Sequence, residues 1–236
     1  MRRSERDFVD YMCSAGVLTF GDFVTKSGRR TPYFVNTGRY TTGAQLRAVG
    51  AFYARAIQER FGDGFDVLFG PAYKGIPLVV AAATALSDDF GRDVPVCFDR
   101  KEAKDHGEGG VLVGHALQNG ERVLIVEDVT TAGTSVRETA PVLRAAADVE
   151  LAGLIVSVDR MERAPGSERS ALAVLADEFA MRTEAIVTLD DIVEHLGPGG
   201  GSHHSLTNDD LERIAAYRAE YGARPGSGGD RETGPA

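Results

Sequence analysis

An apolar strand that leads directly into two acids is the strongest chemical signal in this chain. Residues 123–135 read VLIVEDVTTAGTS, so Glu127 and Asp128 follow the strand and a turn of small residues then opens a helix. Backbone N–H groups of such a turn converge on one point, and the helix N-terminus adds partial positive charge. Hydroxyl groups of the turn can donate further hydrogen bonds, from Thr130, Thr131, Thr134 and Ser135. The segment therefore predicts a binding site for a phosphate monoester.

The two acids before this turn indicate what carries the phosphate. The segment has no lysine where a G-x-x-x-x-G-K-[ST] loop requires one, so it is a different kind of phosphate site. Glu127 and Asp128 stand where they could accept hydrogen bonds from the 2- and 3-hydroxyls of a ribose 5-phosphate. The alternative is a capped helix after a strand with two solvated acids, but the TTAGTS turn favours the binding site.

A second segment gathers cations in a glycine-rich loop. Residues 99–110 read DRKEAKDHGEGG. They include four potential cations: Arg100, Lys101, Lys104 and His106. Arginine binds phosphate oxygens in a bidentate way and lysine binds them as a point charge, so this cationic loop could fold over a pyrophosphate. Glu102 and Asp105 offset much of the charge, and composition alone would also fit a solvated loop.

Isolated residues in three other segments give weaker signals. Lys74 lies in GPAYKGIPL (70–78), where small residues would let the backbone approach a phosphate, although a lone lysine there is usually solvated. Arg160 ends an apolar strand, and arginine is a natural partner for a substrate carboxylate. Tyr33 and Phe34 would by themselves be interpreted as packing residues.

These segments are separated by alternating strands and helices. Apolar strands are predicted at 65–70, 94–99, 122–128, 151–159 and 184–189, and helices at about 4–15, 43–61, 76–86, 135–147, 168–181 and 207–221. The pattern indicates an α/β fold with a doubly wound, mainly parallel sheet and flanking helices. Such sheets bind ligands at the carboxyl ends of their strands, where the candidate residues lie.

Several stretches interrupt this alternation. Residues 17–38 suggest short strands joined by a turn, which form an N-terminal hood (mainly residues 1–40) on a single domain at 1–196. Residues 100–120 are predicted to form a long polar connection of the kind that often acts as a lid. Residues 197–206 are predicted to form a flexible spacer before a C-terminal helix at 207–222, and residues 223–236 a disordered tail.

Composition excludes several classes of function. The chain has 236 residues, of which 43% are hydrophobic and 26% charged, as is usual for a globular enzyme-sized domain. The net charge of −9 argues against general nucleic-acid binding. No apolar run is long enough to span a membrane, so we expect a cytoplasmic protein without membrane partners. Cys13 and Cys97 are the only cysteines and predict two reduced thiols.

Residues 123–135 resemble the motif with which type I phosphoribosyltransferases bind phosphoribosyl pyrophosphate (PRPP). The cationic loop resembles the catalytic loop of the orotate phosphoribosyltransferases, and segments 70–78 and 23–38 also match that family. The resemblance implies PRPP contacts at Lys26, Tyr73, Lys74, Arg100, Lys101, Lys104, His106, Glu127, Asp128, Val129, Thr130, Thr131, Ala132, Gly133, Thr134 and Ser135. It implies orotate contacts at Lys26, Tyr33, Phe34, Thr131 and Arg160.

The same resemblance implies an activity and an assembly. The expected reaction transfers the 5-phosphoribosyl group of PRPP to orotate, in the biosynthesis of UMP, with Lys104, His106 and Asp128 as catalytic residues. Mg²⁺ would be the cofactor, held mainly through PRPP. A homodimer would share its active sites, with Arg100, Lys104 and His106 acting across the interface and Lys101 serving its own subunit. The alternatives are a phosphoribosyltransferase for another base and a PRPP-binding regulator.

Overall fold

A six-stranded sheet forms the centre of the molecule. The structure is a computed structural model, and it describes residues 1–25, 28–104 and 110–224. The strand order is β5 (Gly110–Gly114), β4 (Val96–Lys104), β3 (Val67–Gly70), β6 (Arg122–Val126), β7 (Glu150–Asp159) and β8 (Arg182–Thr188). All neighbouring pairs are parallel except β4 and β5, which are antiparallel at one edge. The predicted doubly wound, mainly parallel α/β fold is confirmed.

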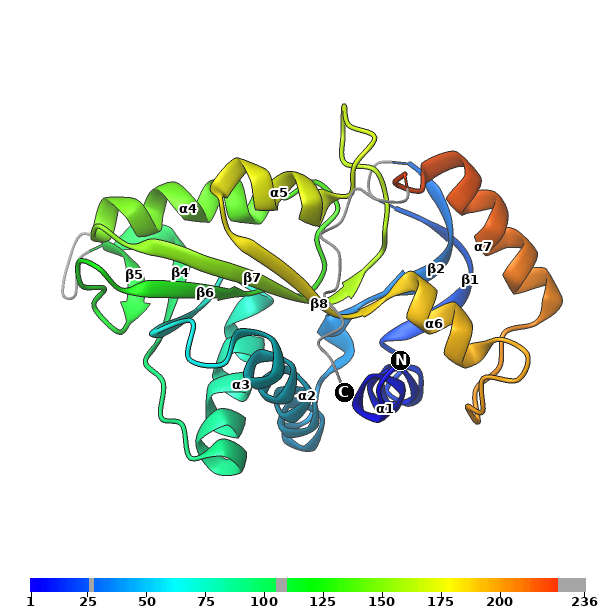
Figure 1. Cartoon of the computed structure of the whole chain (residues 1–236), viewed down its shortest axis with the longest axis horizontal. Helices are drawn as coiled ribbons and strands as arrows, with labels where there is room; N and C mark the ends of the chain where they lie inside the picture. Colours follow the sequence, from blue (N-terminus) through cyan, green and yellow to red (C-terminus); the bar gives the residue numbers. More distant parts are fainter. Residues whose placement is uncertain (26–27, 105–109, 225–236) are drawn as a thin grey trace, which may run out of the picture.

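Helices cover both faces of this sheet (Figure 1). One face carries α1 (Arg3–Ser14), α2 (Gly43–Phe61) and α3 (Gly75–Phe90), and the other carries α4 (Thr134–Ala146) and α5 (Ala171–Phe179). Successive strand residues point to opposite faces, so each strand contributes to both cores. Leu124 and Val126 belong to the core under α1, α2 and α3, whereas Val123 and Ile125 belong to the core under α4 and α5.

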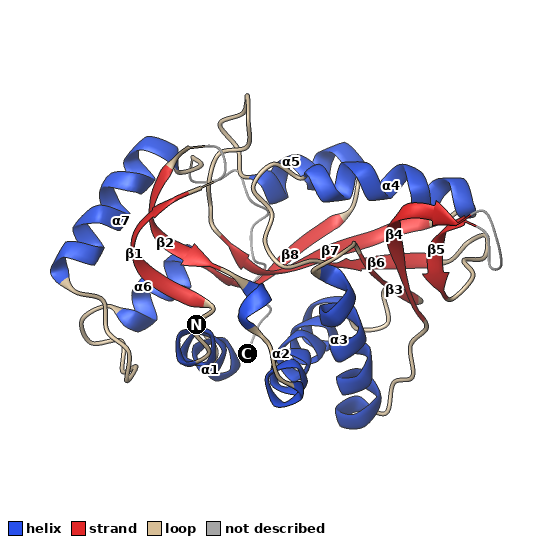
Figure 2. Ribbon diagram, turned by 180° about the vertical axis from the view of Figure 1, so that it is seen from behind, coloured by secondary structure: helices blue, strands red, loops and turns tan. Residues whose placement is uncertain are grey.

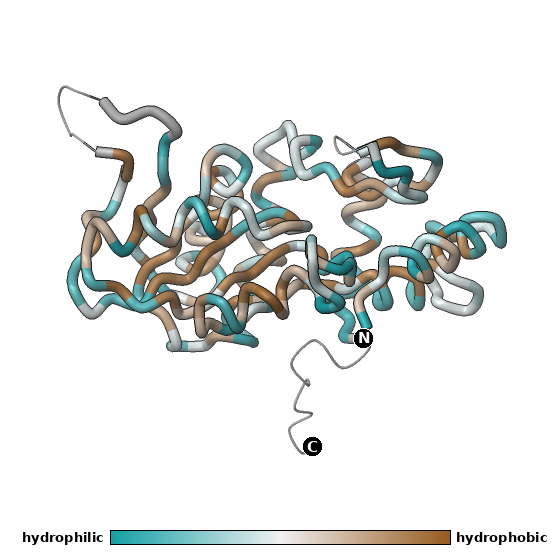
Figure 3. The backbone as a smooth tube through the Cα atoms, turned by 90° about the horizontal axis from the view of Figure 1, so that it is seen from above, coloured by the Kyte–Doolittle hydropathy of each residue, from teal (hydrophilic) through white to brown (hydrophobic). Residues whose placement is uncertain are grey.

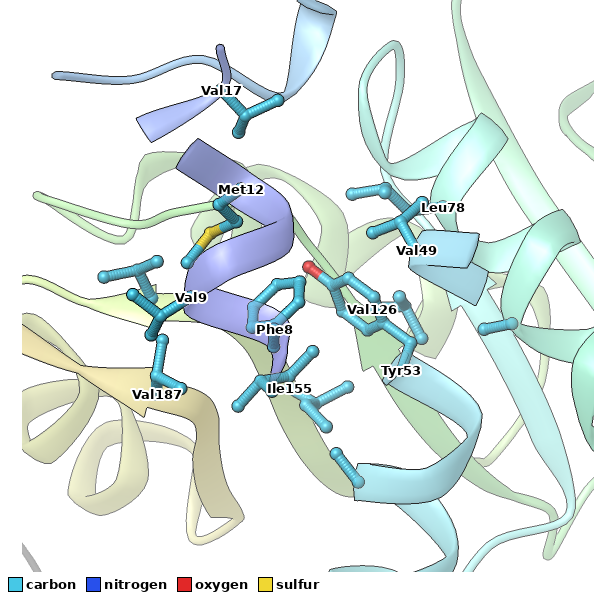
Figure 4. Close-up of a cluster of buried hydrophobic side chains, with 14 of the residues drawn as sticks. Phe8, Val9, Met12, Val17, Val49, Tyr53, Leu78, Val126, Ile155 and Val187 are labelled. Carbon is cyan, nitrogen blue, oxygen red and sulfur yellow. The ribbon is translucent and has the colours of Figure 1, made fainter. Parts of the chain in front are cut away.

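The first helix, α1, is held by apolar side chains from several elements (Figure 4). Phe8, Val9 and Met12 are fully buried and face the sheet and α2. This spacing of three and four residues is what places one side of a helix against a core. In the whole molecule, apolar segments gather in the sheet and polar segments lie outside it (Figure 3).

A small two-stranded sheet stands beside the main one (Figure 2). It consists of β1 (Leu18–Val24) and β2 (Arg30–Val35), paired antiparallel. A short 3-10 helix, η1 (Thr37–Arg39), connects it to α2. The last described helices, α6 (Leu189–Leu196) and α7 (Asn208–Tyr221), lie next to it, and α7 packs on β2. The two-stranded sheet and the last described helices therefore meet near the carboxyl ends of β7 and β8 (Figures 1 and 2).

The structure differs from the sequence-based predictions at several elements. The helix α6 was not predicted, and the strand β5 lies in the segment predicted as a polar connection. Residues 100–104 were predicted to open a loop, but β4 continues to Lys104 and pairs there with Gly110 of β5. The helix predicted at 168–181 is shorter, because Ser170 caps it by accepting a hydrogen bond from the backbone N–H of Ala173, and Ala180 ends it in a left-handed conformation.

The segment predicted as a flexible spacer makes several contacts. The hydroxyl of Ser202 donates to Asp10 of α1, and the ring of His204 is hydrogen-bonded to Ser14 over 3.1 Å. Leu206 is buried. The boundary at residue 196 between one domain and a separate helix stays a prediction.

None of the helices in the described part of the chain combines the length and apolar character needed to cross a bilayer.

Candidate active site

The two acids of the phosphate motif are buried at the carboxyl end of β6. Glu127 and Asp128 are 6% and 7% exposed. Their main chain is fixed by neighbours: Tyr53 of α2 donates its hydroxyl to the carbonyl of Glu127 over 2.7 Å, and Ser157 of β7 donates its backbone N–H to the carbonyl of Asp128 over 2.8 Å. The strand end is therefore held rigidly from both sides, which orients the two carboxylates.

The Asp128 carboxylate has two partners from different parts of the chain. Lys74, which precedes α3, donates from Nζ to Oδ2 over 2.8 Å, and Thr37 of η1 donates its hydroxyl to the same oxygen over 3.0 Å. The other oxygen, Oδ1, accepts no hydrogen bond from the described residues. One side of the carboxylate is thus fixed by the protein, and the other is available to a hydroxyl group of a ligand.

Burial raises the pKa of Glu127 to about 7, and repulsion from the Asp128 carboxylate acts in the same direction. A hydrogen bond from Ser135 opposes this shift. The Glu127 carboxyl group consequently changes charge near neutral pH, so a ligand that hydrogen-bonds to its ionised form can alter its protonation. Perturbed acids of this kind gather at functional sites.

The turn after the acids, residues 129–135, is termed the phosphate turn below. Thr130 accepts a hydrogen bond from the backbone N–H of Gly133 at its hydroxyl oxygen, over 3.0 Å, and Gly133 immediately precedes α4. Gly133 adopts a φ of 71°, and a Cβ at this position would lie 2.7 Å from Leu175. Only glycine fits that backbone and that space, so it sets the direction in which α4 starts. Thr131 and Thr134 are exposed, as donors to a phosphate must be.

A second turn, at Pro71–Lys74, follows the neighbouring strand β3. The backbone N–H of Ala72 donates to the Asp99 carboxylate over 2.5 Å, which ties the turn to β4. The Ala72–Tyr73 peptide is cis, and the Tyr73 side chain is 68% exposed. Gly75 begins α3, and a Cβ there would lie 2.6 Å from Pro71. This compact backbone brings Lys74 next to Asp128.

The residues expected to contact orotate lie on both sides of the hood strand β2. Tyr33 is 1% exposed, whereas Phe34 is 38% exposed and stacks on Phe23 with ring centroids 5.7 Å apart. Adjacent residues of a strand point to opposite faces, so the two rings cannot line the same surface. Arg160 follows β7 with its guanidinium 5.2 Å from the centroid of the Tyr33 ring.

The described residues omit part of the predicted site. Lys26 and His106 lie outside them, and for Lys101 and Lys104 only the backbone within β4 is described. Arg100 is half-buried in β4, beside β3. The carboxyl ends of β3, β6 and β7 do bring together Lys74, the two acids, the phosphate turn and Arg160, on the edge of the sheet where ligands bind in such folds.

Comparisons with known proteins agree with this geometry. Residues 37–195 match the family model described as a phosphoribosyl transferase domain. The chain is 55% identical to the orotate phosphoribosyltransferase of Clostridium beijerinckii over 225 residues, which cover 95% of this chain and 100% of that protein. It is 46% identical to that of Vibrio vulnificus over 222 residues, which cover 94% and 100%. The chain belongs to the orotate phosphoribosyltransferase family.

A solved structure supports the same family membership. The crystal structure of the Francisella tularensis orotate phosphoribosyltransferase aligns with a TM-score of 0.78 at 37% identity, covering 92% of this chain and 100% of that one. The family model begins at Thr37, the residue that donates to Asp128, and so leaves β1 and β2 outside it.

Sequence reasoning missed several residues that fix the orotate phosphoribosyltransferase site. Thr37, Tyr53, Asp99 and Ser157 all bind the acids or the turn beside them. A buried strand end needs partners for its carbonyls, and this could have drawn attention to Ser157 at the matching point of the next strand. For Thr37, Tyr53 and Asp99 the sequence offers no local pattern, because their partners are far away along the chain.

Proposed function

We propose that this chain transfers the 5-phosphoribosyl group of PRPP to a ring nitrogen of orotate, giving orotidine 5′-phosphate and pyrophosphate in the biosynthesis of UMP. The observation that carries the proposal is the buried pair Glu127 and Asp128 directly before the phosphate turn. This arrangement provides acceptors for two ribose hydroxyls next to donors for one phosphate. Close similarity to enzymes named for the same reaction supports it.

We assign the two ends of PRPP to two turns. The 5-phosphate would bind the backbone and hydroxyls of residues 129–135, at the N-terminus of α4. The pyrophosphate would lie between the Tyr73–Lys74 turn and the cations Arg100, Lys101, Lys104 and His106. The Asp128 oxygen that no described residue binds would accept a ribose hydroxyl, and Glu127 would accept the other.

We assign orotate to the side of the site nearest the hood. Arg160 would bind the orotate carboxylate, as a guanidinium binds carboxylates in a bidentate way. The exposed Phe34 ring, Thr131 and Lys26 would complete the pocket. Tyr33 is buried, so its part in orotate binding would be to position Arg160 rather than to touch the base.

The chemistry requires positioning and charge stabilisation rather than a nucleophilic side chain. The ring nitrogen of orotate displaces pyrophosphate at ribose C1, and positive charge develops on the ribose in the transition state. The acids Glu127 and Asp128 would hold the ribose and stabilise that charge, while Lys104 and His106 would stabilise the leaving pyrophosphate. Closure of the cationic loop would exclude water.

We propose Mg²⁺ as the cofactor. Among the described residues, no group of three or more His, Cys, Asp or Glu side chains could form a complete metal cage. Two adjacent carboxylates beside a phosphate site fit an ion of this kind, because Mg²⁺ usually keeps several waters and binds one or two carboxylates together with substrate phosphates. PRPP would mainly hold it, next to Glu127 and Asp128, and it would neutralise charge on the leaving group.

We also propose that the enzyme is a cytoplasmic homodimer with shared active sites. The cationic segment spans the end of β4 and the connection to the edge strand β5, from which it could reach a second subunit. Arg100, Lys104 and His106 would then act in the partner's site, and Lys101 in its own. The cysteines Cys13 and Cys97 are free thiols, which fits a reducing compartment.

A spectrophotometric assay tests the proposal directly. Purified protein is mixed with PRPP, Mg²⁺ and orotate, and loss of orotate absorbance is followed against parallel reactions with adenine, hypoxanthine and uracil. We expect orotate to be consumed and pyrophosphate to be released in equal amounts. Activity with another base and none with orotate would overturn the assignment.

A further inference from the structure

Glu162 is a buried carboxylate to which the site described above gives no role. It is 6% exposed and lies just after β7, two residues beyond Arg160. Four side chains surround it, here termed the Glu162 cluster: Arg29, Tyr33, Arg160 and Tyr217. Arg29 directly precedes β2, Tyr33 lies in β2, Arg160 directly follows β7, and Tyr217 lies in α7.

Each member of the cluster binds the carboxylate directly. Oε1 accepts from the Tyr217 hydroxyl over 2.8 Å and from the Tyr33 hydroxyl over 3.1 Å, and it lies 2.6 Å from Nη2 of Arg160. Oε2 accepts from Nη1 of Arg29 over 3.1 Å. A buried carboxylate with this many donors is fixed in place and cannot rotate independently of them.

The backbone around Glu162 is held as well. Glu162 forms an antiparallel bridge with Gly222, and the N–H of Arg163 donates to the carbonyl of Tyr221 over 2.9 Å. The N–H of Ala223 donates to the carbonyl of Met161 over 2.8 Å. The segment after α7 thus fixes the backbone of the residues around Glu162. The carboxylate therefore has a fixed position relative to Arg160.

The carboxylate occupies only one side of the Arg160 guanidinium. Nη2 faces Glu162 and Nε faces the Tyr33 hydroxyl over 3.5 Å, but Nη1 has no hydrogen-bond partner among the described residues. Two arginines share one carboxylate, which leaves the cluster with a net positive charge. Both features suit an incoming ligand with a single carboxylate.

We propose that Glu162 is a positioning residue for the base: it holds Arg160 in the orientation that receives the orotate carboxylate. The inference rests on the proposed function and adds the residue that prepares the pocket before orotate arrives. Arginine has considerable side-chain entropy, so fixing it in the free enzyme removes a cost that orotate binding would otherwise bear.

The Glu162→Gln variant separates positioning from general stability. Gln has the same shape but no charge, and its amide would turn an N–H₂ group or a neutral oxygen toward each arginine. We expect the KM for orotate to rise about tenfold, while the KM for PRPP and kcat stay within about threefold. Glu168→Gln is the matched control, because Glu168 pairs with Arg163 and Arg224 on the same loop without contacting Arg160. That control should keep the wild-type KM for orotate.

A double-mutant cycle tests whether Glu162 acts through Arg160. In an Arg160→Gln background, Glu162→Gln should change orotate binding, measured by calorimetry, by less than about twofold. An unchanged or lower KM for orotate in Glu162→Gln overturns the proposal, as does an equal loss for both substrates. If Glu162→Gln does not fold, Glu162→Asp, which keeps the charge one methylene further from Arg160, is measured in the same cycle.

The cycle also distinguishes this proposal from the function on which it rests. If the wild-type protein shows no reaction between orotate and PRPP, the proposed function fails, whatever Glu162 does. If Arg160→Gln binds orotate as the wild type does, the assignment of Arg160 fails and the role of Glu162 fails with it. If Arg160→Gln loses orotate and Glu162→Gln does not, only the Glu162 inference is overturned.

Discussion

The two halves of the candidate site are built in opposite ways. The phosphate half consists of consecutive residues, Glu127 to Ser135, which run from β6 through the phosphate turn into α4. The orotate half is held together by the Glu162 cluster, whose members extend from Arg29 to Tyr217. The first half depends on local backbone geometry, whereas the second depends on packing between the hood, β7 and α7.

This difference has a physical consequence for substitutions. A change in the phosphate half removes a group that would touch PRPP directly, so its main expected effect is on PRPP, even though Asp128 also binds Lys74 and Thr37. A change in the Glu162 cluster acts through several partners, so it should affect orotate binding and stability together. The predictions below test this contrast, beginning with the cationic loop that we expect to bind the leaving pyrophosphate.

Lys104→Ala is expected to have the largest effect. If Lys104 stabilises the leaving pyrophosphate in the transition state, kcat should fall about a hundredfold or more while the KM for PRPP changes by only a few-fold. Glu102→Gln, in the same segment, serves as the control. Mixing Lys104→Ala subunits with Asp128→Asn subunits should give more activity than either variant alone if the loop acts across a dimer interface. Normal turnover in Lys104→Ala would contradict the catalytic role.

Asp128→Asn tests the phosphate half. Loss of a charged acceptor for a ribose hydroxyl should lower kcat/KM for PRPP roughly 30- to 150-fold, which corresponds to about 2 to 3 kcal/mol of lost transition-state stabilisation. Orotate affinity should stay close to that of the wild type. Asp66→Asn is a suitable control, because Asp66 pairs with Arg122 at the opposite end of β6. An equal loss of affinity for both substrates would break the separation between the two halves.

The raised pKa of Glu127 predicts a pH dependence. In the free enzyme this carboxyl is protonated below about pH 7, and a ribose hydroxyl that donates to it favours the ionised form, so PRPP binding should release a proton between about pH 5 and pH 7. PRPP affinity should rise with pH across this range and then level off. Calorimetry in two buffers measures the released protons, and Glu127→Gln should remove this component.

The raised pKa of Glu127 also makes the stability of the folded protein depend on pH. The folded carboxyl holds its proton up to about pH 7, whereas the unfolded one loses it near 4.5, so the folded state binds more protons between these values. The free energy of unfolding contributed by Glu127 therefore falls as pH rises from about 4.5 to about 7. Urea unfolding of the wild type and Glu127→Gln should show a difference that grows in this direction; a constant difference would contradict it.

Tyr217→Phe is expected to have the smallest effect, in the orotate half. Removing one of several donors to a buried carboxylate should cost about 1 kcal/mol of stability and raise the KM for orotate about two- to threefold. Tyr221→Phe lies on the same helix and makes no hydrogen bond to Glu162, so it is the control. An effect on PRPP alone would contradict the assignment of α7 to the orotate half.

The contrast also explains what the sequence could predict. The alternation of apolar strands with helices predicted the sheet, and VLIVEDVTTAGTS placed the acids at a strand end, because both signals lie within a few consecutive residues. Thr37 and Glu162 could not be recognised, since a threonine just after a strand and a glutamate in a polar loop have no distinctive local pattern. Their partners are supplied only by the folded chain.

The prediction for the end of β4 was wrong for a different physical reason. Residues 101–104 are mostly polar and were assigned to a loop, yet they belong to β4, and Lys104 pairs with Gly110 of β5. An edge hairpin can use polar residues because its hydrogen bonds come from the main chain and one side faces solvent. Hydrophobic pattern alone does not distinguish such a hairpin from a loop.

The packing of α7 on β2 has a consequence for synthesis of the protein. The ribosome releases the segments of the phosphate half when β7 emerges, but Tyr217 and the residues that pair with Met161 and Arg163 emerge only with the last described part of the chain. Domains generally fold as units during synthesis. The contacts that complete the orotate half can therefore form only after α7 has left the ribosome, well after the segments of the phosphate half have emerged.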